Sequence, residues 1–123
     1  MSPKKIHILL ADDENEIATI VSSILKRAGH TVDLAADGSE ALDLLKENPA
    51  RYDLIITDSN MPVVSGIELI EHLRKTEYPG KIILLSGYAT ELEDQYRYLR
   101  IDRIMQKPFT FADLINVVKE TAG

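Results

Sequence analysis

The chain has 123 residues, of which 45% are apolar and 28% are charged, with a net charge of −6 and no cysteine. This size and composition fit one soluble domain covering residues 1–123, and an acidic chain without a Lys/Arg stripe argues against direct nucleic-acid binding. The lack of cysteine excludes disulfides, and no apolar stretch approaches the roughly 18 residues of a membrane span, so we expect a cytoplasmic protein without membrane contact.

Strand and helix signals alternate five times along the chain, beginning with an apolar run at residues 6–11. A helix is predicted next, and Gly29 has the position of its C-terminal cap. One stripe with helical spacing forms the expected buried face of this helix: Ile17, Ile20, Val21, Ile24, Leu25 and Ala28. A second, short strand is predicted at residues 31–35, followed by a helix that opens at residues 37–39 and ends before Pro49. The apolar face of that helix consists of Ala41, Leu42 and Leu45.

The second half of the chain repeats the alternation. After a third run at residues 54–57 and a turn at 60–62, Ser65 and Glu68 have the spacing of a capping box, which predicts a helix reaching about residue 75. A fourth run covers residues 82–85, and a second capping box at Thr90–Glu93 opens a helix expected to bury Leu92, Tyr96 and Leu99. The fifth run covers residues 104–106. The last helix follows Thr110, with an apolar face of Phe111, Leu114, Ile115 and Val118.

The apolar runs show no polar alternation, which is typical of strands that are buried on both faces of a parallel sheet. Alternating strands and helices then predict a doubly wound α/β fold with right-handed crossovers, and we take its strand order to be 2-1-3-4-5. In such sheets ligands bind beyond the carboxyl ends of the strands, where the strand order reverses. This position lies between strands 1 and 3.

Polar groups stand where four of these strands end, so the predicted sheet would bring them to one rim. They are Asp12 and Asp13 after the first strand, Asp58 after the third, Ser86 after the fourth and Lys107 after the fifth. Three carboxylates, one hydroxyl and one ammonium at such a rim indicate a site for a divalent cation and a phosphoryl group.

The three acids have an alternative explanation as helix caps, and Glu16 fits the spacing of a cap that begins at Asp13. Capping needs only one acid, however, and clustered carboxylates raise each other's pKa unless a cation joins them. Mg²⁺ suits the set, because it takes one or two carboxylates and leaves room for phosphate oxygens. A ligand set made only of oxygen, without cysteine or suitably spaced histidine, argues against zinc.

Lys107 and Ser86 also have ordinary explanations, as a solvated surface lysine and as the start of a turn with Gly87. Lys107 directly follows an apolar strand and precedes Pro108, which restricts its backbone to extended conformations and places its ammonium at the rim. Each of these polar residues alone is weak evidence for a phosphoryl site. Because all of them stand at strand ends of the predicted sheet, together they favour such a site.

A set of motifs spanning essentially the whole chain resembles a response-regulator receiver domain of two-component signalling, of the CheY-like kind. The set consists of Asp12-Asp13, residues 58–62 with Gly66, Ser86-Gly87 and residues 107–109. The resemblance implies a (βα)5 flavodoxin-like sandwich in which Asp58 is the phosphoacceptor. It also implies that Asp13 and Asp58 bind Mg²⁺ directly with the backbone carbonyl of Asn60, while Asp12 acts mainly through water.

The same resemblance implies that Lys107, the Ser86 hydroxyl and Gly87 bind the phosphoryl group, and that the Lys107–Pro108 bond is cis. The implied donor is a phosphohistidine on a sensor histidine kinase or histidine phosphotransfer protein. The expected output is contact with a downstream protein target or effector domain through the face formed by strand 4, helix 4 and strand 5. The expected state is a monomer or a phosphorylation-dependent dimer.

One position departs from the family pattern. Members usually carry Tyr or Phe three residues before the lysine, and this chain has Ile104 there. Isoleucine is stiff at χ1 and has no polar tip, so we expect Ile104 to stay buried in both states of the switch. Tyr88, Tyr96 and Tyr98 then form either core contacts or an alternative output surface.

Two other functions remain possible on the sequence alone. One is a protein-interaction module that keeps the fold but works without phosphorylation, which the Ile104 departure favours. The other is a Mg²⁺-dependent phosphohydrolase with an aspartyl-phosphate intermediate. It ranks last, because residues 59–62 offer no second acid to activate water. The phosphorylated switch is therefore the principal prediction, and it is not an enzyme in the ordinary sense.

Overall fold

The computed structural model describes residues 5–61, 63–87 and 97–122 and contains a five-stranded sheet in the order β2-β1-β3-β4-β5. All neighbouring strands pair in parallel. The strands are β1 (His7–Ala11), β2 (Thr31–Ala35), β3 (Leu54–Asp58), β4 (Lys81–Ser86) and β5 (Arg103–Gln106). The predicted fold class and strand order are confirmed.

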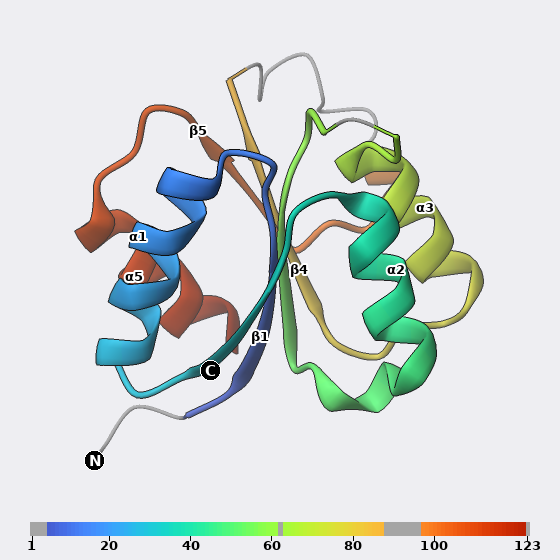
Figure 1. Cartoon of the computed structure of the whole chain (residues 1–123), viewed down its shortest axis with the longest axis horizontal. Coiled ribbons are helices and arrows are strands. Elements are labelled where there is room, and N and C mark those ends of the chain that lie inside the picture. Colours follow the sequence, from blue (N-terminus) through green and yellow to red (C-terminus); the bar gives the residue numbers. More distant parts are fainter. Residues whose placement is uncertain (1–4, 62, 88–96, 123) are drawn as a thin grey trace.

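Helices cover both faces of this sheet. They are α1 (Asn15–Arg27), α2 (Gly38–Glu47), α3 (Gly66–Lys75) and α5 (Phe111–Ala122), with a short 3-10 helix at Pro49–Arg51. Figure 1 shows α1 and α5 on one side of the sheet and α2 and α3 on the other. The start of the helix predicted from Thr90, with Leu92 and Tyr96, lies outside the described residues. Residues 97–99 are helical, and Leu99 is buried as expected. No helix in the described ranges is long and apolar enough to cross a membrane.

The core has two parts, one on each side of the sheet. Alternate side chains of β3 enter each part: Leu54 and Ile56 pack with the residues of α1 and α5, and Ile55 packs with those of α2 and α3. Every residue of β3 is buried, as expected for a central parallel strand. This burial fixes β3 as a rigid support for the side chain at its carboxyl end.

The predicted helix boundaries are confirmed where local capping chemistry sets them. Ser65 and Glu68 form both hydrogen bonds of a capping box at the start of α3. The Thr110 hydroxyl accepts a hydrogen bond from the Asp113 amide at the start of α5. Gly29 follows α1 with a φ of 104°, a left-handed conformation that favours glycine at a helix C-terminus.

The predicted buried stripe of α1 is wrong at several positions. The residues that α1 buries are Ala18, Val21, Ser22 and Leu25, whereas Ile17 and Ile20 are 43% and 48% exposed. Successive residues of an α-helix are rotated by about 100° around its axis. On this basis the centre of the buried face lies midway between Val21 and Ser22, and Ile17 and Ile20 point about 90° and about 150° away from that centre. The stripe had the correct period but the wrong centre.

The predicted face of α5 needs a similar correction at its first residue. Leu114 and Val118 are buried as expected, together with Val117, which the prediction missed. Ile115 is only half-buried. Phe111 is 48% exposed, because the contact of α5 with the core begins one turn later, at Leu114.

Candidate functional site

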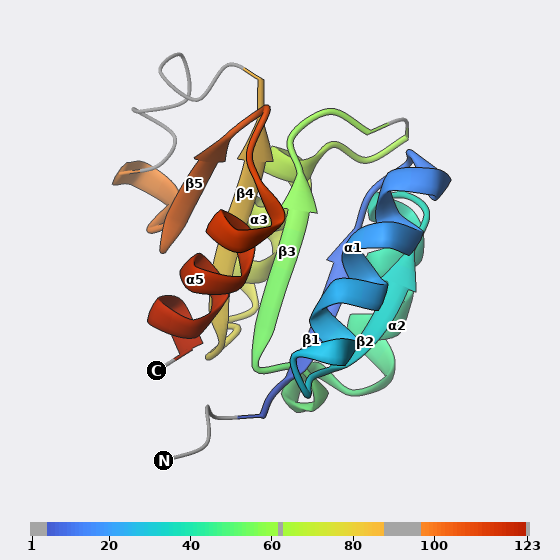
Figure 2. The ribbon, with the colours of Figure 1, turned by 90° about the vertical axis from the view of Figure 1, so that its left-hand side faces the viewer.

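The site lies at the rim formed by the carboxyl ends of the strands, which point the same way in Figure 2. Ala11 of β1 pairs with Thr57 of β3, so Asp12 and Asp58, the next residue of each chain segment, emerge side by side. β3 has β1 on one side and β4 on the other, whereas β2 lies beyond β1. The rim between β1 and β3 is therefore the point where the strand order reverses, as predicted.

Asp58 is the last residue of β3 and is 4% exposed. Its Oδ2 lies 2.7 Å from the Lys107 ammonium, and its Oδ1 accepts a hydrogen bond of 3.2 Å from the Asn60 amide. Both carboxylate oxygens thus have a donor, which fixes the orientation of the side chain. The Lys107 ammonium therefore lies at the rim, as the sequence predicts.

Two further acids approach Asp58. Carboxylate oxygens of Asp12, Glu14 and Asp58 lie within 4.8 Å of one another. Asp12 is buried, and its Oδ1 accepts a hydrogen bond of 2.9 Å from the Glu14 amide, which holds the loop after β1 in a tight turn. Asp13 is exposed and does not belong to this group of three. Sequence reasoning missed Glu14, although it directly follows the acidic pair.

The acids at this rim do not cap the helix that follows them. The N-terminal cap position of α1 is Glu14, and its side chain makes no capping hydrogen bond. The Asp12 carboxylate bonds to the amide of Glu14 instead of to an amide of the first helical turn. The alternative explanation of Asp12 and Asp13 as ordinary caps therefore fails for α1.

The charges of the site act on one another. Burial raises the pKa of the Asp12 carboxyl, and the negative charge of Asp58 raises it further. The hydrogen bond from the Glu14 amide lowers this pKa, but it does not cancel the increase, so the pKa of Asp12 lies above its usual value. For Lys107, burial lowers the pKa, but the hydrogen bond and charge of Asp58 outweigh it, so the pKa is raised. Lys107 therefore stays charged, and the carboxylates gain from any further cation.

Ser86 and Gly87 lie beside this group at the end of β4. Leu85 pairs with Asp58, so the buried Ser86 stands one residue beyond the phosphoacceptor candidate. The Lys107 amide donates a hydrogen bond of 2.8 Å to the Ser86 carbonyl, which ties the ends of β4 and β5 together. The Lys107–Pro108 bond is cis, as predicted. A Cβ at Gly87 would meet no atom within 4 Å.

The candidate output residues fall into three groups. Ile104 is only half-buried and packs against the core beneath α2 and α3, so the expectation that it is fully buried needs correction. Tyr98 is 83% exposed and so does not pack in the core. Tyr88 and Tyr96 lie outside the described residues. An edge-strand position such as 104 faces fewer neighbours than one in β3 or β4, which explains its partial exposure.

The donor atoms at the rim fit a hard divalent cation. The three carboxylates of Asp12, Glu14 and Asp58 supply only oxygen, the ligand type that Mg²⁺ prefers. Within the described residues, this cluster contains no cysteine or histidine. Fold and site together define a doubly wound α/β domain with an acidic, cation-binding type of site at the carboxyl ends of its strands.

The chain belongs to the response regulator receiver domain family, whose model matches residues 8–119. It is a phosphoryl-accepting receiver of two-component signalling with a CheY-like, flavodoxin-type fold. It is 32% identical to the response regulator receiver protein CpdR of Brucella abortus over 114 residues, which cover 92% of this chain and 93% of CpdR. It is 37% identical to the sensor kinase CckA of the same organism over 117 residues, which cover 92% of this chain but only 12% of CckA.

Solved structures agree with this assignment. The response regulator TrrA of Thermotoga maritima, solved in complex with Mg²⁺-BeF, has a TM-score of 0.83 at 34% identity, covering 94% of this chain and 98% of TrrA. The chemotaxis protein CheY4 of Vibrio cholerae has a TM-score of 0.86 at 30% identity, covering 96% of this chain and 99% of CheY4. Receivers in this family bind Mg²⁺ at an acidic pocket.

Proposed function

We propose that Asp58 is the phosphoacceptor of this receiver and that residues 1–123 form one receiver domain. The observation that carries the assignment is the buried Asp58 carboxylate, with Lys107 at 2.7 Å and two further acids within 4.8 Å. A buried carboxylate with a fixed cation on one oxygen is oriented for attack, and the other oxygen has only a weaker amide contact. The module acts as a switch and not as an enzyme with a substrate of its own.

The transfer uses the carboxylate as a nucleophile. An oxygen of Asp58 attacks the phosphorus of a phosphohistidine in line, the new O–P bond forms as the P–N bond breaks, and the imidazole leaves with the electron pair. Negative charge then spreads over the equatorial phosphoryl oxygens. The Lys107 ammonium and the Ser86 hydroxyl, with the Gly87 backbone, donate to these oxygens.

The acids of the rim would hold Mg²⁺. The proposed ligands are Asp13, Asp58 and the backbone carbonyl of Asn60, with Asp12 acting through water; the position of Glu14 within the acidic cluster makes it a further candidate. When bound, Mg²⁺ supplies positive charge that neutralises both the acids and the incoming phosphoryl oxygens.

The proposed donor is a sensor histidine kinase or a histidine phosphotransfer protein in the cytoplasm. Support comes from the exposed Ile17 and Ile20 in the first two turns of α1, directly after the acidic loop. These two side chains offer a donor an apolar contact beside the rim. The downstream protein target or effector domain would bind the face formed by β4, the helical segment after it and β5, and Tyr98 of that segment is exposed.

The test is to incubate the chain with Mg²⁺ and acetyl phosphate and to weigh the intact protein. A single phosphoryl adduct that decays slowly and disappears in Asp58→Asn is expected. The matched control is Asp43→Asn, an exposed acid of α2 that should keep the adduct. No adduct would favour an interaction module that works without phosphorylation, and rapid turnover of acetyl phosphate would favour a hydrolase.

A further inference from the structure

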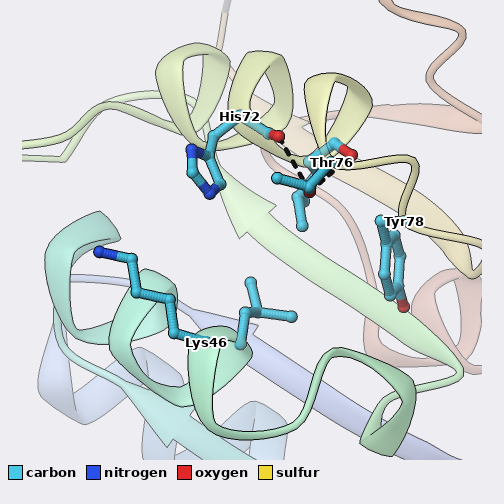
Figure 3. A pocket seen from close by; sticks show the side chains of 6 residues that line it. Lys46, His72, Thr76 and Tyr78 are labelled. Carbon is cyan, nitrogen blue, oxygen red and sulfur yellow. Dashed lines mark hydrogen bonds between the residues drawn. The ribbon is translucent and has the colours of Figure 1, made fainter.

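A hollow of about 180 Å³ lies between the C-terminal ends of α2 and α3, away from the phosphoryl site (Figure 3). Its lining residues are Leu45, Lys46, His72, Leu73, Thr76 and Tyr78. α3 begins beside Asp58 and runs for ten residues, so the hollow is roughly 15 Å from the rim along this helix. Nothing in the phosphoryl-transfer chemistry uses it.

The inner part of the hollow is apolar and has a fixed shape. Leu45 and Leu73 are buried, and the Tyr78 ring is held because its hydroxyl donates a hydrogen bond of 2.8 Å to the Tyr52 carbonyl. The Thr76 hydroxyl lies 3.1 Å and 3.2 Å from main-chain carbonyls of its own helix and is occupied there. The interior therefore offers van der Waals contact but no unsatisfied polar group.

One end of the hollow carries two polar nitrogen-bearing side chains. Figure 3 shows Lys46 and His72 at that end and the Tyr78 ring at the other. Lys46 belongs to the last turn of α2, and His72 to the last turn of α3. Neither side chain has a hydrogen-bond or ion-pair partner among the residues that the structure describes. No acidic residue lines the hollow, so no carboxylate of the lining neutralises the Lys46 ammonium at the edge of the hollow.

We propose that this hollow binds a small amphipathic carboxylate. The carboxylate would bind the Lys46 ammonium and the His72 imidazole, and an apolar body would pack against Leu45, Leu73 and Tyr78. An apolar cavity of about 150 Å³ is large enough for benzene, so this space suits one aromatic ring with a short acidic chain. A ligand of this size would bind weakly, with a Kd on the order of 1 mM.

The first experiment titrates the ¹⁵N-labelled full chain with sodium phenylacetate at low salt and follows the amide shifts. Saturable shifts are expected in the last turns of α2 and α3. Benzyl alcohol, which lacks the carboxylate, and acetate, which lacks the ring, should each bind at least fivefold more weakly. Shifts that stay linear to the highest concentration, or that scatter over the surface, would overturn the proposal.

Two variants test the charged end. Lys46→Gln and His72→Gln should each weaken phenylacetate binding at least threefold. Lys75→Gln is the matched control, because it removes a cation from the same last turn of α3 but outside the hollow. Equal weakening by Lys46→Gln and Lys75→Gln would show general charge attraction and would refute the site. Repeating the titration with Asp58→Asn, where binding should persist, separates this proposal from the phosphoacceptor assignment.

Discussion

Gly66 lies against the backbone of Asp58 so closely that a Cβ at position 66 would overlap the Asp58 carbonyl oxygen. The Gly66 amide also donates a hydrogen bond of 3.1 Å to the Ser59 carbonyl. Gly66 is the first residue of α3, so this helix starts in direct contact with the strand end that carries the candidate phosphoacceptor. A shift of the Asp58 backbone therefore cannot leave the start of α3 unchanged.

Replacing Gly66 by alanine should destabilise the protein and disturb the site. Because the added methyl group meets backbone atoms that cannot rotate away, we expect the free energy of unfolding to fall by about 1–3 kcal/mol. Urea unfolding measures this change. The matched control is Gly87→Ala, because a Cβ there meets no atom and should change stability little. Equal effects of the two substitutions would contradict the close contact at Gly66.

Removing the charge of Lys107 should cost stability through Asp58. In Lys107→Met the buried Asp58 carboxylate loses its closest donor, and we expect a loss of about 1–3 kcal/mol in unfolding free energy. Adding Asp58→Asn to this variant should recover part of the loss, because the uncompensated charge is gone. If urea unfolding shows purely additive effects, the two side chains are not coupled. Lys26→Met, at the end of α1, controls for loss of a surface lysine.

Mg²⁺ should stabilise the folded chain by relieving repulsion among the acids of the rim. A ligand that binds only the native state adds RT ln(1 + [L]/Kd), about 2.7 kcal/mol at 100 times Kd. Thermal melts with MgCl₂ and with NaCl at equal ionic strength measure the difference, and coincident melts would refute a metal site. Comparing Asp13→Asn with Glu14→Gln decides which of these acids is a ligand, since only the ligand's loss should abolish the difference.

A further prediction about charge concerns Asp33, whose partners are residues outside the rim. Burial opposes ionisation of its carboxyl, but the hydrogen bond from the Tyr52 hydroxyl (2.7 Å) and the charges of His7 and Arg51 outweigh burial, so its pKa lies below the usual 3.8. The unfolded chain binds this proton more readily. Its stabilising contribution is therefore present above pH 3.8 and is lost as pH falls through the folded-state pKa.

The measurement is the unfolding free energy of wild type and Asp33→Asn across the acid range. The wild type should be more stable near neutral pH, and the difference should shrink once the pH drops below 3.8. A difference that is independent of pH would contradict the assignment. Asp43→Asn, an exposed acid on α2, should show no comparable loss at neutral pH.

Ile104 should keep its packing when the site is occupied. Its side chain contacts the core beneath α2 and α3, is stiff at χ1 and has no polar atom to favour exposure. In methyl NMR spectra with and without Mg²⁺ and beryllofluoride, we expect the Ile104 signal to keep its rotamer while the Ser86 and Gly87 amides shift. A rotamer change at Ile104 would mean that isoleucine does replace the usual aromatic as a moving part.

The sequence predicts the fold because its signals are local. The capping pair Ser65 and Glu68 and the apolar run at residues 54–57 determine where α3 and β3 form, and both appear in the structure as expected. The parallel arrangement then brings Asp58 and Lys107 together across β4 without any further information. A strand-end pattern therefore predicts a site whenever the strand order is known.

The predictions are wrong or incomplete where the sequence allows two local arrangements and only tertiary contacts determine which of them forms. The sequence of α1 contains two overlapping apolar stripes, and only packing on the sheet selects the one through Ala18 and leaves Ile20 exposed. Similarly, three consecutive acids follow β1, and the hydrogen bond from the Glu14 amide to Asp12 decides which carboxylates approach Asp58. The periodicity of apolar residues in the sequence predicts neither which stripe of α1 is buried nor which acids after β1 approach Asp58.

The depth of Asp58 has a consequence for the recognition of partners. With 4% of its surface exposed, this carboxylate cannot reach out to a histidine that lies flush with a donor's surface. The phosphorus has to travel inward, on an imidazole that projects beyond its neighbours. A donor can therefore react only if its phosphorylated imidazole projects far enough to reach Asp58 and fits between the loops of the rim. This requirement applies in addition to any charged or apolar contact between the two proteins. A small acyl phosphate meets no such requirement, so its reactivity and that of a protein donor are separate properties of the same carboxylate.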